Sequence, residues 1–123
     1  YRGKVIAWEY LAQMYFDQNK YTEAQWFLLQ AQEIAKNKGF KEELAEIEYL
    51  LASSKLADKN FKVSKKEFLT ANTLALAEEN KYLELAINDK LTEVYWNLKD
   101  YDKAEETYNN YLALKAQLFS DKN

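Results

Sequence analysis

The sequence predicts an all-α fold in which three antiparallel helical hairpins stack into a solenoid. The 123 residues include only two glycines and no proline, the residues that usually mark turns and sheet edges. The aromatic residues Tyr21, Phe61 and Tyr101 stand forty residues apart, and a fixed period of this length is typical of solenoid repeats. Apolar residues also recur at spacings of three and four, which predicts amphipathic helices.

Six helices are expected, in the ranges 3–17, 21–38, 40–58, 61–79, 81–98 and 101–118. They group into three repeats at about 3–38, 40–79 and 81–118 of a single domain. Each helix is supported by apolar or small residues on one face: Trp8, Leu11, Ala12, Tyr15; Ala24, Leu28, Ala31, Ala35; Leu44, Ile47, Leu51; Phe68, Ala71, Leu74; Leu91, Tyr95, Leu98; Ala104, Tyr108, Tyr111.

Polar segments separate these helices and suggest how their ends are capped. Gly39 suits a left-handed C-cap, and Asn80 is the next best residue for such a position. Thr22 and Ser64 lie near helix starts, where a hydroxyl group can accept a hydrogen bond from a free backbone N–H.

The composition excludes several function classes. Without His or Cys there is no thiol nucleophile, Ser-His-Asp triad, zinc finger or disulfide framework. Glycine-rich phosphate loops are absent, and a net charge of −3 argues against a nucleic-acid partner. Adjacent carboxylates such as Glu42 and Glu43 point about 100° apart on a helix, so they do not converge on one substrate atom. We therefore expect no enzyme activity, no cofactor and no metal site.

The residues named above resemble the tetratricopeptide repeat, whose pattern is Trp-x2-Leu-Gly/Ala-x2-Tyr followed by Ala-x3-Phe-x2-Ala. The resemblance implies a right-handed superhelix that binds a protein or peptide. The matching residues are Trp8, Leu11, Ala12, Tyr15, Ala24, Leu28 and Ala31 in the first repeat, Ser64, Phe68 and Ala71 in the second, and Leu91, Tyr95, Ala104 and Tyr108 in the third.

The chain departs from that family in two respects. Its period is forty residues where the common repeat has about 34, and the proline that often closes each repeat is absent. In the second repeat Lys55 falls at the Tyr position unless the turn holds one extra residue, so the register of that helix stays open.

The resemblance also suggests a biological context. Long repeats of this kind are frequent in bacterial signalling proteins, and residues 108–123 are similar to the end of the last repeat in sensor regions of histidine kinases. This implies a sensor or regulatory domain of a two-component protein, periplasmic in that case and otherwise cytoplasmic. The chain starts at Tyr1 and is expected to be a fragment of a larger protein. The alternatives are a scaffold for assembling a complex and a peptide-binding regulator of the quorum-sensing type.

In tetratricopeptide repeats the first helix of each pair lines a concave groove, and this implies which side chains meet a ligand. Carboxylates and aromatic rings dominate the set, so a basic or neutral extended segment is the expected partner. The alternative is that the charges are a solvated face and the rings belong to the core. The candidate groove residues are Glu9, Gln13, Phe16, Tyr49, Ser53, Asp89, Glu93, Trp96 and Asn97, flanked by Ile6, Asp17, Glu46, Leu56, Ala57 and Ala86.

The last helix carries a second candidate surface. Tyr111, Leu114 and Leu118 share one face, whereas a solenoid normally ends in a polar cap. Such an apolar face indicates either a following helix or a homodimer. No membrane contact is expected from this segment, because no apolar run approaches about 20 residues.

Overall fold

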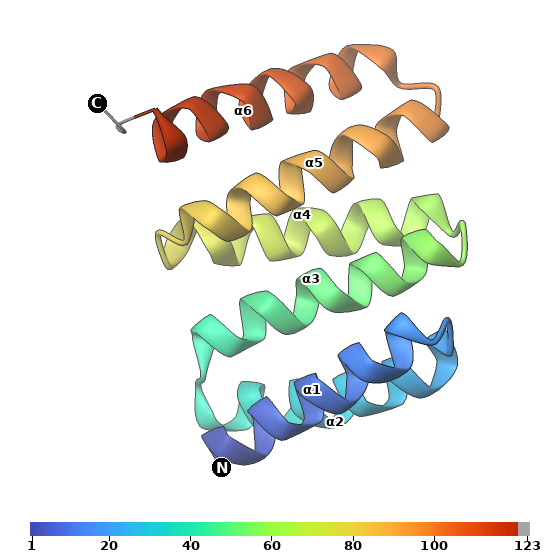
Figure 1. The fold of residues 1–123 in the computed structure, drawn as a ribbon, viewed down its shortest axis with the longest axis vertical. Helices are drawn as coiled ribbons and strands as arrows, with labels where there is room; N and C mark the ends of the chain where they lie inside the picture. The colour runs from blue at the N-terminus through green and yellow to red at the C-terminus, as the bar shows by residue number, and fades with distance from the viewer. Residues whose placement is uncertain (121–123) are drawn as a thin grey trace.

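The structure is a computed structural model that describes residues 1–120, and over that range it consists of helices joined by short turns (Figure 1). The helices are α1 (Arg2–Asp17), α2 (Tyr21–Lys38), α3 (Lys41–Ala57), α4 (Phe61–Ala77), α5 (Lys81–Asn97) and α6 (Tyr101–Phe119). This confirms the predicted all-α fold of helical hairpins, and every helix begins and ends within two residues of its expected range. The last three residues of the segment 108–123 lie outside the described residues.

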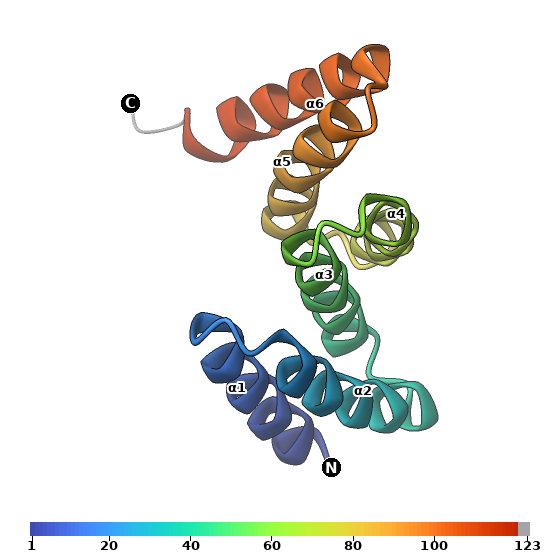
Figure 2. The same cartoon turned by 90° about the vertical axis from the view of Figure 1, so that its right-hand side faces the viewer.

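The helices form a curved stack. Each helix packs against its neighbours in sequence, and α3 also contacts both α1 and α5. Among residues 1–120, by contrast, α2, α4 and α6 make no contact with one another. The first helices of the three pairs therefore form the inner row of the stack, and Figure 2 shows α2 and α4 on one side of that row.

One turn geometry joins all six helices. The residue two positions before each new helix has a positive φ, between 54° and 71°, at Asn19, Gly39, Lys59, Glu79 and Lys99. In every turn the next backbone N–H donates to the carbonyl five residues earlier at 2.9 Å, which is the longer hydrogen bond of a Schellman motif. The forty-residue repeat is thus built from two identical steps of twenty residues.

The capping predictions are partly wrong. Gly39 adopts the expected left-handed conformation, but at the later turn this conformation belongs to Glu79 and not to Asn80. Asn80 is instead the N-cap of α5, where its Oδ1 accepts from Leu83 N at 3.1 Å. Ser64 caps nothing, because it lies inside α4 and its hydroxyl donates to Phe61 O.

Thr22 also lies inside a helix, one residue beyond the start of α2. The caps with side-chain hydrogen bonds are Asn60, Asn80 and Asp100. Their amide and carboxylate oxygens stand one position before the helices, where they reach the free N–H groups of the first turn.

The equal turns also resolve the register of α3. Because Asn19 and Lys59 occupy the same place in their turns, the second repeat holds no extra residue and Lys55 takes the Tyr position. Its Nζ donates to Gln25 Oε1 on α2 at 3.2 Å. A polar contact between pairs thus replaces the aromatic packing that Tyr15 makes with Phe27 in the first repeat.

The core consists of two clusters that meet at α3. One cluster joins α1, α2 and α3 around Leu28, and the other joins α3 through α6 around Phe68. Leu28 and Phe68 are almost fully buried, because α3 and α5 cover them. The equivalent Tyr108 on α6 is 49% exposed, since α6 packs against α5 and no other described helix.

The apolar residues predicted to form an exposed face of α6 are not the ones that the structure exposes. Tyr111, Leu114 and Leu118 are each partly buried. They follow the buried Ala104 and Thr107 along the side of α6 that packs on α5. The large apolar side chains that α6 exposes are Tyr101, Tyr108, Leu112 and Phe119. None of the helices within residues 1–120 combines the length and apolar character that a membrane span requires.

Candidate binding groove

The inner row of helices carries two hollows, one at each end of α3. Both hollows are bordered by side chains of α1 and α3, and the second also reaches α5. Such a position suits a ligand that lies across several repeats, because every helix of the row contributes side chains.

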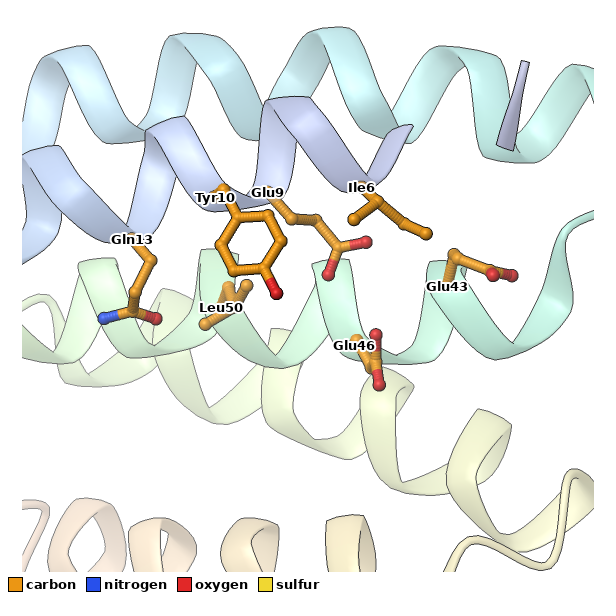
Figure 3. A pocket seen from close by; sticks show the side chains of 7 residues that line it. All are labelled: Ile6, Glu9, Tyr10, Gln13, Glu43, Glu46 and Leu50. Atoms are coloured by element: carbon orange, nitrogen blue, oxygen red, sulfur yellow. The ribbon is translucent and has the colours of Figure 1, made fainter. Parts of the chain in front are cut away.

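The first hollow, here the acidic pocket, has a volume of about 320 Å³ between α1 and α3. Figure 3 shows the α1 side chains projecting toward α3, with the α3 side chains opposite. Three of its lining residues are glutamates and two are aliphatic, so it combines negative charge with apolar walls. The lining residues are Ile6, Glu9, Tyr10, Gln13, Glu43, Glu46 and Leu50.

The carboxyl groups of this pocket interact strongly with one another. Burial raises the pKa of Glu9 to about 8, and the nearby carboxyl groups of Glu46 and Glu43 add to that rise. Burial also raises the pKa of Glu46. Glu9 therefore keeps its proton near neutral pH, because its charged form would be both desolvated and close to other carboxylates.

Glu43 is held by a basic residue from the start of α1. Arg2 Nε lies 3.0 Å from Glu43 Oε2, and the same guanidinium group stacks 4.4 Å from the ring centroid of Phe40. One carboxyl oxygen of Glu9 and one of Glu43 remain buried with no amide, amine or hydroxyl donor among the described residues. Both oxygens therefore retain an unused acceptor position.

The second hollow, here the mixed-charge pocket, has a volume of about 360 Å³. It contains the rings of Phe16 and Phe61 together with two lysines and one glutamate. The two lysines offset the charge of Glu93 in this pocket. The negative charge expected of the groove is therefore found at the α1–α3 end. The lining residues are Phe16, Ser53, Leu56, Ala57, Lys59, Phe61, Lys90, Glu93 and Asn97.

The structure brings six of the nine candidate groove residues into these pockets. Glu9 and Gln13 line the acidic pocket, and Phe16, Ser53, Glu93 and Asn97 line the mixed-charge pocket. Several polar groups already have partners: Ser53 Oγ donates to Tyr49 O at 2.9 Å, and Asn97 Nδ2 donates to Glu93 O at 2.8 Å.

The other three candidates line neither pocket. Tyr49 is half-buried and packs on Phe68 with ring centroids 5.8 Å apart; burial raises the pKa of Tyr49. Asp89 is exposed, and its charge adds to that rise in the pKa of Tyr49. Trp96 is 63% exposed and meets Tyr101 edge to face at 4.9 Å.

The pockets also contain residues that sequence reasoning did not select. Glu43 and Leu50 precede and follow Glu46 by three and four residues, so helical spacing could have placed them on its face. Lys59 and Phe61 come from the turn and the start of α4. Nothing in the sequence assigns a turn or a second helix to the groove, so these two could be found only from the structure.

Within residues 1–120 no group of three or more carboxylates is arranged to hold a metal ion. No family model matches the chain, and no curated protein is significantly similar to it.

Proposed function

We propose that the chain is a non-catalytic module that binds an extended protein or peptide segment along its inner row of helices. The observation that carries this proposal is the pair of pockets on one face, one acidic and one of mixed charge, with aromatic and aliphatic walls. Aromatic anchors within a polar rim are typical of peptide-recognition surfaces.

The charges suggest the orientation of the ligand. A lysine or arginine side chain fits the acidic pocket, which is lined by Glu9, Glu43 and Glu46. An aromatic or aliphatic side chain fits beside Phe16 and Phe61 in the mixed-charge pocket. The segment then runs from the α1–α3 end toward α5 with its basic residue at the α1–α3 end.

The resemblance of residues 108–123 to kinase sensor regions supports a finer proposal. In this view the module is the sensor or regulatory region of a bacterial two-component protein, and a ligand in the groove changes the curvature of the stack. A peptide-binding regulator would use the same groove. The alternative of an assembly scaffold is favoured by one observation, the apolar face that α6 leaves exposed.

Binding to an array of fluorescent fifteen-residue peptides with matched basic and acidic sequences tests the groove. Basic peptides should bind more tightly, and Glu9→Gln with Glu46→Gln should weaken that binding about tenfold, equivalent to about 1.4 kcal/mol. Phe16→Ala should weaken peptides that carry an aromatic residue.

The matched control is Glu33→Gln with Glu78→Gln, which removes two carboxylates outside both pockets. It should leave the affinity unchanged. A preference for acidic peptides, or equal losses in the two double variants, would contradict binding in the acidic pocket.

A further inference from the structure

One flank of α6, about 100° round the helix from the side that packs on α5, carries a seam, here the α6 stripe, formed by four apolar and two charged residues: Tyr101, Glu105, Tyr108, Leu112, Lys115 and Phe119. Its four apolar side chains are between 44% and 52% exposed. At 100° per residue these four lie within about 20° of one line along the helix. All are on the described part of the chain, where α6 contacts only α5.

The spacing of the α6 stripe is that of a helix that pairs with another helix. Successive members are separated by four, three, four, three and four residues, which is the alternation of a coiled-coil seam. Two aromatic residues of α5 widen the stripe at its ends. Trp96 contacts Tyr101 at 4.9 Å between ring centroids, and Tyr82 contacts Phe119 at 6.1 Å.

The sequence of the α6 stripe is also symmetric about residue 110. Tyr101 and Phe119 stand nine residues from that point on either side, Glu105 and Lys115 five residues, and Tyr108 and Leu112 two residues. When two copies of α6 lie antiparallel about a two-fold axis beside residue 110, each residue therefore faces its counterpart. Tyr108 meets Leu112 of the second copy, and Tyr101 meets Phe119.

The charges of the stripe fit only this direction. In the antiparallel pair Glu105 faces Lys115 of the second copy, and the two-fold axis makes that ion pair twice. In a parallel pair Glu105 would face Glu105 and Lys115 would face Lys115, which is repulsive. Among residues 1–120 Lys115 has no ion-pair partner, and its Nζ lies 5.7 Å from the ring centroid of Tyr111.

We propose that the chain forms a two-fold symmetric homodimer by antiparallel pairing of the α6 stripe with the same stripe of a second copy. None of the stripe residues lines either pocket, so the proposal does not depend on ligand binding there. A helix of 19 residues is about 28 Å long, so the interface lies below the area of about 1,200 Å² at which stable complexes begin. The dimer is therefore weak and reversible, with a dissociation constant in the micromolar range or above.

Sedimentation equilibrium of the 123-residue chain over about 5 to 500 μM is the first test. A monomer–dimer equilibrium is expected, and Leu112→Lys should raise its dissociation constant about tenfold or more. Circular dichroism should show unchanged helix content, because Leu112 is an exposed residue. A chain that stays monomeric throughout overturns the proposal and leaves a different helix as the occupant of the stripe. Assemblies that grow beyond a dimer also overturn it.

Exchange of charges tests the direction of pairing. Glu105→Lys or Lys115→Glu alone should each weaken the dimer about three- to tenfold by placing like charges opposite each other. The double variant E105K/K115E should return the dissociation constant to within about twofold of the original. Glu106→Lys, which makes the same charge change about 100° round the helix, should have little effect. Failure of the double variant to recover rules out the proposed register.

Cross-linking gives a readout that does not depend on affinity. The chain has no cysteine, so Tyr108→Cys and Leu112→Cys each introduce a single thiol. Oxidation of an equal mixture should form the mixed disulfide faster than either variant alone forms its own disulfide. Equal rates for all three products would contradict the antiparallel register.

Discussion

The raised pKa of Glu9 is caused partly by residues that are far from it in sequence. Its equivalents forty and eighty residues later are Tyr49 and Asp89, so the repeat itself does not require a carboxylate here. In the fold Glu9 lies half-buried opposite Glu46 and Glu43. Glu9 therefore keeps a proton near neutral pH, which makes this position sensitive to pH.

The stability of the protein should fall as the pH rises from about 4.5 to about 8. The pKa of Glu9 is raised from 4.5 to about 8, so the folded state keeps a proton that the unfolded chain has lost. The contribution of this proton is fully present below about pH 4.5 and is lost as the pH rises through about 8. Because solvent reaches the half-buried pair, we expect a loss of only about 1–2 kcal/mol between pH 5 and pH 9.

Urea unfolding at pH 5, 7 and 9 measures this dependence. Glu9→Gln keeps a neutral group in the pocket, so it should flatten the pH dependence and stabilise the protein at pH 9. Glu33→Gln, on the exposed surface of α2, should follow the original protein. Identical pH profiles for all three proteins would show that the folded protein does not raise the pKa of Glu9.

The five turns adopt the same backbone conformation although different residue types occupy them. All five turns place a left-handed residue at every twentieth position, yet only one of these residues is glycine. A side chain in this conformation costs about 1 kcal/mol or more. Asn19 tolerates the conformation best among the other four, whereas Lys59, Glu79 and Lys99 bear the full strain.

Replacing Lys99 by glycine should therefore stabilise the protein. We expect Lys99→Gly to raise the free energy of unfolding by about 0.5–1 kcal/mol, since the relief of strain exceeds the entropy that glycine adds to the unfolded chain. Gly39→Ala should lower it by about 1 kcal/mol. A Cβ at Gly39 meets no atom within 4 Å, so that loss comes from the backbone conformation alone.

Thermal or urea unfolding measures both variants. Lys66→Gly, in the middle of α4, is the control and should destabilise the protein by about 0.5–1 kcal/mol. A loss of stability in Lys99→Gly comparable to that in Lys66→Gly would mean that the left-handed turn residue is not strained.

At the scale of the whole molecule, α3 joins the two halves of the core. It contributes to both apolar clusters and carries the longest series of buried side chains, from Ala45 to Leu56. The terminal helices have neighbours on fewer sides, because α6 packs only on α5. Stability in such a stack is approximately a sum of nearest-neighbour terms.

Hydrogen exchange at about 5 μM should therefore be slowest in α3 and fastest in α6 and the first turn of α1. At about 500 μM the amides of α6 should become better protected if the dimer forms, while those of α1 stay unchanged. Leu112→Lys should remove the concentration dependence and keep the order of protection. Uniform protection of all the helices would contradict a stack held together by local contacts.

Much of the fold could be predicted because its signals are local. The spacing of Tyr21, Phe61 and Tyr101 shows the repeat, and apolar periodicity locates every helix to within two residues. Helix ends are set by hydrogen bonds among neighbouring residues. The capping errors at Asn80 and Ser64 therefore misplace a cap by only one or a few positions. The resemblance to tetratricopeptide repeats, and not the spacing alone, pointed to six of the candidate groove residues that line the two pockets.

The tertiary structure decided what those residues meet. It paired Glu9 with Glu46, brought Lys59 and Lys90 beside Phe16, and turned Leu114 inward while Leu112 faces out. These outcomes depend on the rotation of each helix against its neighbours and on the helices that cover it. Sequence by itself determined which side chains share a helix face, because helical geometry is local. Packing determined which faces meet, because burial and charge coupling arise between segments that are distant along the chain.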